Sequence, residues 1–229
     1  MAQQPANGPT GRFFDAHQRQ TIAAAMARII PSGDEPGAQE AGTVDFVDHY
    51  LSGIDYIYAK PDGSGFEQLV GKQAAVWRQR IAILQQTYRA GVAELDRRAH
   101  SAYGAPFAGL EPDQQDQILT ALERPAQATE QQLTQAATTA AWAPVEPAMQ
   151  QVSTETELAF FPLLALHTRQ GFYADPIYGG NRDHIGWKLI GFAGPESLAD
   201  THAGRFTTLP YFAEQAGDSP KEAPRDEQE

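Results

Sequence analysis

Residues 66–102 read FEQLVGKQAAVWRQRIAILQQTYRAGVAELDRRAHSA, and this stretch decides the fold class. Large apolar residues recur in it at steps of three and four, which is the period of one face of an α-helix. Gly71 and Gly91 are weak points, because glycine costs about 1 kcal/mol in a helix interior. The predicted core face holds Leu69, Gln73, Val76, Trp77, Arg80, Ile81, Leu84, Tyr88, Val92 and Leu95. The predicted water-facing side holds Arg78, Gln79, Gln85 and Gln86.

Shorter helical patterns precede this stretch. Asp15 stands just before apolar residues at helical spacing, which predicts a helix capped by Asp15 and ended by Pro31. A second short pattern lies between Thr43 and Gly53, and we expect Thr43 to cap it. The run KPDGSG at residues 60–65 is typical of a turn, so it should separate this second helix from the long one.

Further helices are expected after the long one. Residues 103–106, Tyr-Gly-Ala-Pro, stop it, and Pro112 opens a helix that reaches Leu122. Residues 125–151 are rich in Ala, Gln and Thr, which favours either a weak, solvated helix or a pliable connection.

A strongly apolar helix is predicted next. Thr154 and Glu157 have the spacing of a capping box, and a band of large apolar residues follows them. Pro162 falls well inside this helix if Thr154 is its cap, so we expect a kink between Leu158 and Phe161.

The whole pattern is that of an all-α protein. No periodic strand series appears, and the apolar share of 41% suffices for one packed interior in 229 residues. We predict a single irregular helical domain over residues 13–212 with a long ordered C-terminal loop. Residues 1–12 and the acidic tail at 213–229 are polar and rich in Pro or Gly, and we expect both to be disordered.

Composition excludes several classes of function. A formal charge of −12 opposes binding to nucleic acid or to an anionic membrane, because both need a cationic face. No apolar run approaches the roughly 18 residues that span a bilayer, so no direct membrane insertion is expected. Cysteine is absent, which removes thiolate nucleophiles and cysteine-ligated zinc or iron–sulfur clusters. The histidines are too far apart in the sequence to predict a metal site.

The most distinctive segment is the predicted C-terminal loop, where turn formers stand beside large aromatic residues. Its Gly179-Gly180-Asn181-Arg182 run has neither the Lys-Ser/Thr of a Walker A loop nor a dinucleotide fingerprint, and it predicts a tight turn. Two readings of Asp175, Asp183 and His184 stay open: a cluster for acid–base catalysis, or structural hydrogen bonds. The candidate site residues are Asp175, Pro176, Tyr178, Gly179, Gly180, Asn181, Asp183, His184, Gly186 and Trp187.

The same segment carries a family resemblance. Residues 161–195 read FPLLALHTRQGFYADPIYGGNRDHIGWKLIGFAGP and resemble the C-terminal signature of the gluconate 2-dehydrogenase subunit 3 family. The chain from Phe13 through Pro31 to Gly42 is similar to that family's opening, and residues 107–122 resemble its middle. Together these segments cover most of the chain from Phe13 to Pro195.

The resemblance implies an accessory role. Members of the family pair with a large flavoprotein of the glucose-methanol-choline (GMC) oxidoreductase type, whose FAD accepts a hydride from a sugar or polyol. We therefore expect no catalytic residue, cofactor or metal in this chain, FAD in the partner, and a cytochrome c subunit as a further candidate partner. Many members carry a twin-arginine signal, whereas no Arg-Arg pair precedes an apolar stretch here, so we expect either a cytoplasmic protein or export with a partner.

Two hypotheses about the loop follow. Residues 175–187 either dock on the flavoprotein near its substrate entrance or lock the packing of this chain's own C-terminal part. The alternative function, from another class, is a stand-alone enzyme or ligand-binding module that uses Asp175, Asp183 and His184.

Overall fold

The computed structural model describes residues 12–123, 155–195 and 198–204. The longer helices are α1 (Ala16–Ile29), α2 (Thr43–Ser52), α3 (Gly71–Tyr103), a helix over residues 112–123, and α6 (Phe160–Tyr173). Shorter ones are α7 (Ile185–Leu189), α8 (Leu198–His202) and the 3₁₀ turns η1 (Ile54–Tyr56), η2 (Phe107–Gly109), η3 (Pro176–Tyr178) and η4 (Arg182–His184). The all-α prediction is confirmed: the described residues contain no strand, only one isolated bridge between Ala59 and Phe66.

Several predictions concern residues outside the described part of the chain. They are the disordered ends, apart from Arg12, the weak helix at 125–151, and the cap at Thr154.

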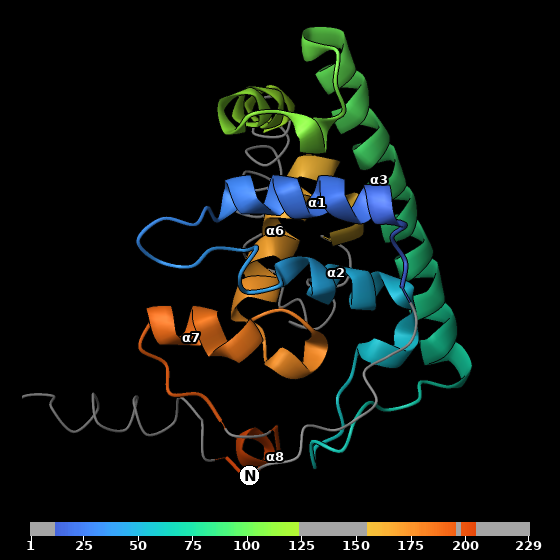
Figure 1. The fold of residues 1–229 in the computed structure, drawn as a ribbon. Coiled ribbons are helices and arrows are strands. Elements are labelled where there is room, and N and C mark those ends of the chain that lie inside the picture. Colours follow the sequence, from blue (N-terminus) through green and yellow to red (C-terminus); the bar gives the residue numbers. More distant parts are fainter. Residues whose placement is uncertain (1–11, 124–154, 196–197, 205–229) are drawn as a thin grey trace, which may run out of the picture.

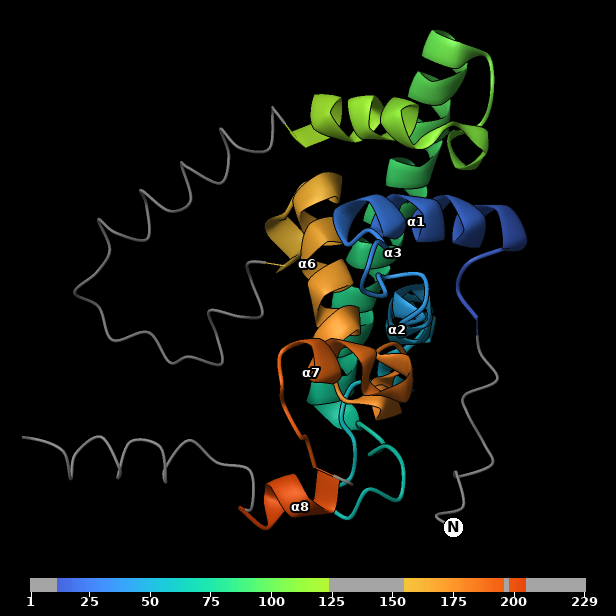
Figure 2. The same ribbon diagram turned by 60° about the vertical axis from the view of Figure 1, so that its left-hand side comes forward.

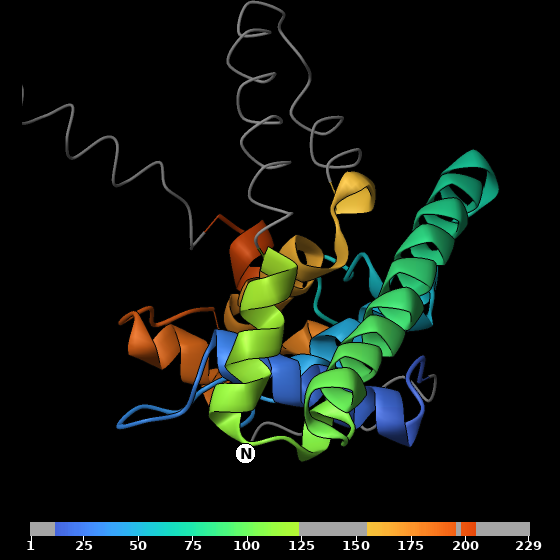
Figure 3. The ribbon, with the colours of Figure 1, turned by 90° about the horizontal axis from the view of Figure 1, so that it is seen from above.

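The helices pack around one core from two sides. The long helix α3 runs along one side of the molecule, and α1 and α2 lie across it, one above the other (Figure 1). Helix α6 packs against all three from the other side (Figure 2). The helix over residues 112–123 lies across the top of α1, as the view from above shows (Figure 3). The candidate loop and α7 follow the lower end of α6, beneath α2 (Figures 1 and 2).

The starts of α1 and α2 are built differently. Asp15 caps α1 as predicted, since its carboxylate accepts a hydrogen bond from the Gln18 N–H at 2.8 Å. The predicted cap at Thr43 is wrong: Thr43 is the first helical residue of α2, and Gly42 is the N-cap with a φ of 63°. The chain turns tightly here because the Thr43 N–H donates to the Ala38 carbonyl at 3.0 Å, a geometry that needs glycine at the preceding position.

The long helix α3 is continuous but begins later than the sequence pattern indicates. Phe66 lies instead in the bridge to Ala59, so the segment before Gly71 pairs with the residues that precede the turn at 60–65. The predicted core face is correct from Arg80 onward, whereas Val76 is 56% exposed. In the first turns of α3 the buried residue is Ala74, which the predicted core face did not include.

The predicted kink near Pro162 is a complete break. A short helical turn over residues 155–157 ends before Leu158, and α6 restarts at Phe160 with Ala159 as its N-cap. Pro162 therefore falls in the first turn of α6, where the missing N–H of proline leaves no hydrogen bond unmade. Among the helices described, none is long and apolar enough to cross a membrane.

Candidate functional site

The base of the candidate loop is held by Asn181, which is fully buried. Its amide nitrogen donates to the Ala174 carbonyl, and its amide oxygen accepts from the Gly186 N–H, both at 2.8 Å. One side chain thus joins the end of α6 to the start of α7. Asn181 adopts a left-handed conformation with a φ of 42°, which asparagine tolerates better than most residues.

Gly186 and Trp187 complete this base by close packing. A side chain at Gly186 would place its Cβ 2.0 Å from the Phe172 carbonyl oxygen, so only glycine fits there. Trp187 is 5% exposed, and its indole N–H donates to the Tyr173 carbonyl at 2.7 Å. These contacts give the loop a fixed position on α6.

The first part of the loop is also a defined structure. The Asp175 carboxylate accepts a hydrogen bond from the Ile177 N–H at 2.9 Å, and Pro176 opens the 3₁₀ turn η3. The Tyr178 hydroxyl accepts from the Ala59 N–H at 3.4 Å, and its ring meets the Phe66 ring edge-on at a centroid distance of 5.7 Å. Gly179 and Gly180, with φ of 89° and 74°, make the predicted tight turn.

The tip of the loop faces outward. Arg182, Asp183 and His184 are all exposed. Asp183 and His184 have φ of 55° and 57°, so two consecutive side chains occupy the left-handed region. Such backbone strain persists only where surrounding contacts hold it, and it is concentrated at functional sites.

The structure does not join the three residues of the predicted acid–base cluster. Asp175 is engaged with its own turn, and His184 packs beside the Trp187 ring at 4.9 Å between centroids. Within the described residues, no hydrogen bond or ion pair links Asp175, Asp183 and His184. No group of three or more His, Asp or Glu side chains in this part of the chain has the geometry to hold a metal ion.

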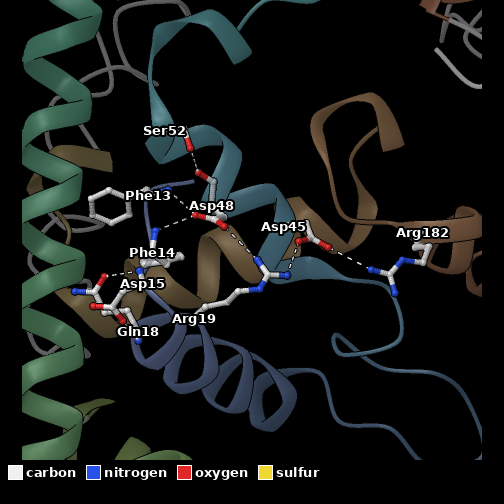
Figure 4. Close-up of polar contacts among 9 residues, drawn as sticks. All are labelled: Phe13, Phe14, Asp15, Gln18, Arg19, Asp45, Asp48, Ser52 and Arg182. Carbon is white, nitrogen blue, oxygen red and sulfur yellow. Dashed lines mark hydrogen bonds and ion pairs between the residues drawn. The ribbon is translucent and has the colours of Figure 1, made fainter. Parts of the chain in front are cut away.

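An ion-pair network ties the loop to α1 and α2 (Figure 4). Arg182 approaches Asp45 of α2 at 3.2 Å, and Arg19 of α1 contacts the other oxygen of the same carboxylate at 2.5 Å. Arg19 also reaches the buried Asp48 at 3.2 Å, and Asp48 accepts hydrogen bonds from the Phe13 and Phe14 N–H groups. The loop tip is therefore anchored at one end through Asp45, which Arg19 links to Asp48.

A second polar network, which was not predicted from the sequence, lies in the core. Arg80 of α3 pairs with Glu155, and Glu155 contacts the His167 ring nitrogen Nε2. The Tyr88 hydroxyl meets the His167 Nδ1 at 2.9 Å, and its ring stacks on the imidazole at an interplanar angle of 5°. The signal that could have revealed this network is Arg80 itself, because a charge on an apolar helix face requires a buried partner.

The contacts assign the protonation state of this network. Burial lowers the pKa of His167 to about 3, with the charge of Arg80 adding to the effect, so the imidazole is neutral. Burial also raises the pKa of Tyr88 well above its ordinary value, so the phenol keeps its proton and donates it to Nδ1. The other ring nitrogen, Nε2, then carries the hydrogen that is donated to Glu155. A neutral histidine held in this way stabilises the core.

Exposed apolar side chains gather next to the loop. Leu189, Ile190 and Phe192, which end α7 or follow it, are 40%, 60% and 42% exposed. Tyr173 at the end of α6 is 42% exposed, and its carbonyl binds Trp187. The Phe192 ring also packs edge-on against Trp187, at 5.3 Å between centroids. Exposed apolar groups clustered on a fixed base are typical of a protein–protein contact.

A family model described as gluconate 2-dehydrogenase subunit 3 matches residues 16–194 of this chain. The matched range contains the whole candidate loop and every helix from α1 to α7. No curated protein and no solved structure matches the sequence.

Proposed function

Because the chain belongs to the gluconate 2-dehydrogenase subunit 3 family, as its resemblance predicted, we propose that it is a non-catalytic accessory subunit of an FAD-dependent dehydrogenase. In this proposal the large subunit is a flavoprotein of the GMC type that oxidises sugars, sugar acids or glycosides. The small subunit stabilises, matures or escorts it and holds no cofactor of its own. A cytochrome c subunit is a candidate third partner that would receive the electrons.

The observation that carries this proposal is the exposed face formed by the loop tip and the end of α7. Its apolar members are Leu189, Ile190 and Phe192. They stand on a base fixed by Asn181 and Trp187. A rigid face with exposed aromatic and aliphatic side chains loses little conformational entropy on binding, which favours a stable complex.

The geometry suggests that the two hypotheses about the loop apply to different residues. Asn181, Gly186 and Trp187 are buried and support the packing of the C-terminal part. Asp183 and His184 are exposed and strained, which suits a surface that meets a partner. We therefore infer that the base of the loop is structural and that its tip, with the adjoining apolar residues, docks on the flavoprotein.

Co-purification with the proposed large flavoprotein subunit tests the proposal. Ile190→Ser should lower recovery of the partner by about tenfold, since removing one apolar anchor costs roughly 1–2 kcal/mol of binding. Val76→Ser is the matched control, because Val76 on α3 is 56% exposed and lies outside the proposed face. Neither substitution should change the melting temperature of the isolated chain by more than a few degrees.

Trp187→Ala separates the base from the tip. It should lower the melting temperature of the isolated chain, because it removes a buried ring and leaves the Tyr173 carbonyl without its donor. Equal loss of partner by Val76→Ser and Ile190→Ser would contradict the proposed face. Oxidation of a sugar by the isolated chain, assayed with a dye acceptor, would contradict the accessory role itself.

A further inference from the structure

A hollow of about 440 Å³ opens between α2, η1, the end of α6 and η3. This volume lies within the roughly 300–1,000 Å³ range of small-ligand sites. Its walls are mainly aromatic and include Phe46, Tyr50, Tyr56, Tyr173, Tyr178 and the amide side chain of Gln170. Tyr173 links the hollow to the base of the loop: its side chain lines the hollow, and its carbonyl accepts the indole N–H of Trp187.

Contacts among the rings hold the walls in place. Phe66 stands between Tyr56 and Tyr178 and meets both rings edge-on at 5.7 Å. Phe46 and Tyr50 are parallel, with centroids 6.0 Å apart and an interplanar angle of 9°. Tyr50 is fixed in turn by its hydroxyl, which donates to Glu155 at 3.3 Å. The hollow is therefore a preformed feature of the fold.

Hydrogen-bonding groups in the hollow are available to a ligand. Among the described residues, none forms a hydrogen bond with the hydroxyls of Tyr56 and Tyr173 or with the side-chain amide of Gln170. None of the described residues that line the hollow is charged. A ligand that matches this lining is itself uncharged and has both an apolar surface and hydroxyl groups.

We propose that this aromatic hollow binds a neutral pyranose ring. One face of a pyranose presents C–H groups, which are attracted to the negative face of an aromatic ring. Its hydroxyls can exchange hydrogen bonds with phenols and an amide that would otherwise bind water. A sugar acid fits less well, because no lining arginine or lysine compensates a carboxylate that leaves water. This binding site goes beyond the accessory role and does not rest on it.

Saturation-transfer NMR on the isolated chain tests the site with methyl glucoside as the probe and methyl glucuronide, which keeps the pyranose ring and adds a carboxylate, as its anionic counterpart. We expect transfer to the ring protons of methyl glucoside and little to methyl glucuronide. Tyr173→Ala and Gln170→Ala, both at the exposed rim, should each weaken binding by about tenfold, the effect of losing one stacking or hydrogen-bonding contact. Tyr58→Ala is the matched control, since Tyr58 is 40% exposed against 42% for Tyr173 and does not line the hollow.

Three results would overturn the proposal: no transfer to methyl glucoside, wild-type binding by both rim variants, or equal loss with Tyr58→Ala. If the rim variants instead lower recovery of the flavoprotein while sugar binding is absent throughout, the hollow receives a side chain of the partner and is not a sugar site. Because the NMR experiment uses the chain alone, its failure leaves the accessory role standing. Ile190→Ser should retain the sugar signal, which keeps the two tests separate.

Discussion

Gly91 of the long helix α3 packs against the Phe160 ring at the start of α6. A Cβ at this position would lie 2.0 Å from an atom of the Phe160 ring. Gly91→Ala should therefore lower the free energy of unfolding by about 1–3 kcal/mol, the usual cost of overpacking, although alanine favours a helix by about 1 kcal/mol over glycine. Urea denaturation of the purified chain measures this difference.

A second substitution identifies the cause. Adding Phe160→Leu to Gly91→Ala removes the ring that the new methyl group meets, so the double variant should be more stable than the sum of the single changes predicts. Strict additivity of the two single changes would show that the contact between Gly91 and Phe160 does not determine the effect.

At the scale of elements, the 3₁₀ turn η4 holds two of the three non-glycine residues with positive φ in the described chain, Asp183 and His184. Asp183 has a φ of 55° and is exposed, so its side chain adds backbone strain without burying surface. Asp183→Gly should raise the free energy of unfolding by up to about 1 kcal/mol, because glycine adopts this conformation without strain. Thermal unfolding measures the change.

Lys188→Gly, in the regular helix α7, is the control and should instead lower stability. A loss of stability in both variants would contradict strain at Asp183.

The start or end of a helix could be predicted from the sequence where the residues that determine it are close together in the chain. The cap at Asp15 and the stops at Pro31 and Gly104 were correct because each depends on hydrogen bonds within a few residues. The cap at Thr43 was wrong because Ala38, part of a tight turn, accepts its N–H. The late start of α3 has the same kind of cause, since its first predicted residue pairs with Ala59.

The candidate site shows a similar limit. The turn residues of the loop were identified because glycine, proline and asparagine report backbone conformation directly. Their arrangement was not predictable: Asn181 is the buried anchor, while Asp183 and His184 point outward. The sequence left open whether Asp175, Asp183 and His184 form one cluster, and no described contact joins Asp183 or His184 to Asp175.

At the scale of the whole molecule, the buried polar network links elements that are distant in sequence. Arg80 and Tyr88 come from α3, Glu155 from the short turn before α6, and His167 from α6 itself. Tyr50 of α2 contacts the same carboxylate. Removing one partner of a buried ion pair leaves the other charge buried without compensation, which is costly. Because the partners come from different elements, this network couples the packing of α2, α3 and α6.

The network should make the stability of the whole fold depend on pH. The pKa of His167 is about 3 in the folded chain, against about 6.5 for an unfolded histidine, so below pH 6.5 only the unfolded state takes up this proton. The contribution of His167 is therefore complete above pH 6.5 and falls as pH decreases, with a slope that approaches about 1.4 kcal/mol per pH unit. Urea unfolding between pH 7 and 5 measures this slope.

His167→Gln should be less stable at pH 7 and should remove most of the slope, whereas His17→Gln, at an exposed position, should retain the slope. An unchanged slope in His167→Gln would mean that other groups govern the acid sensitivity of the fold.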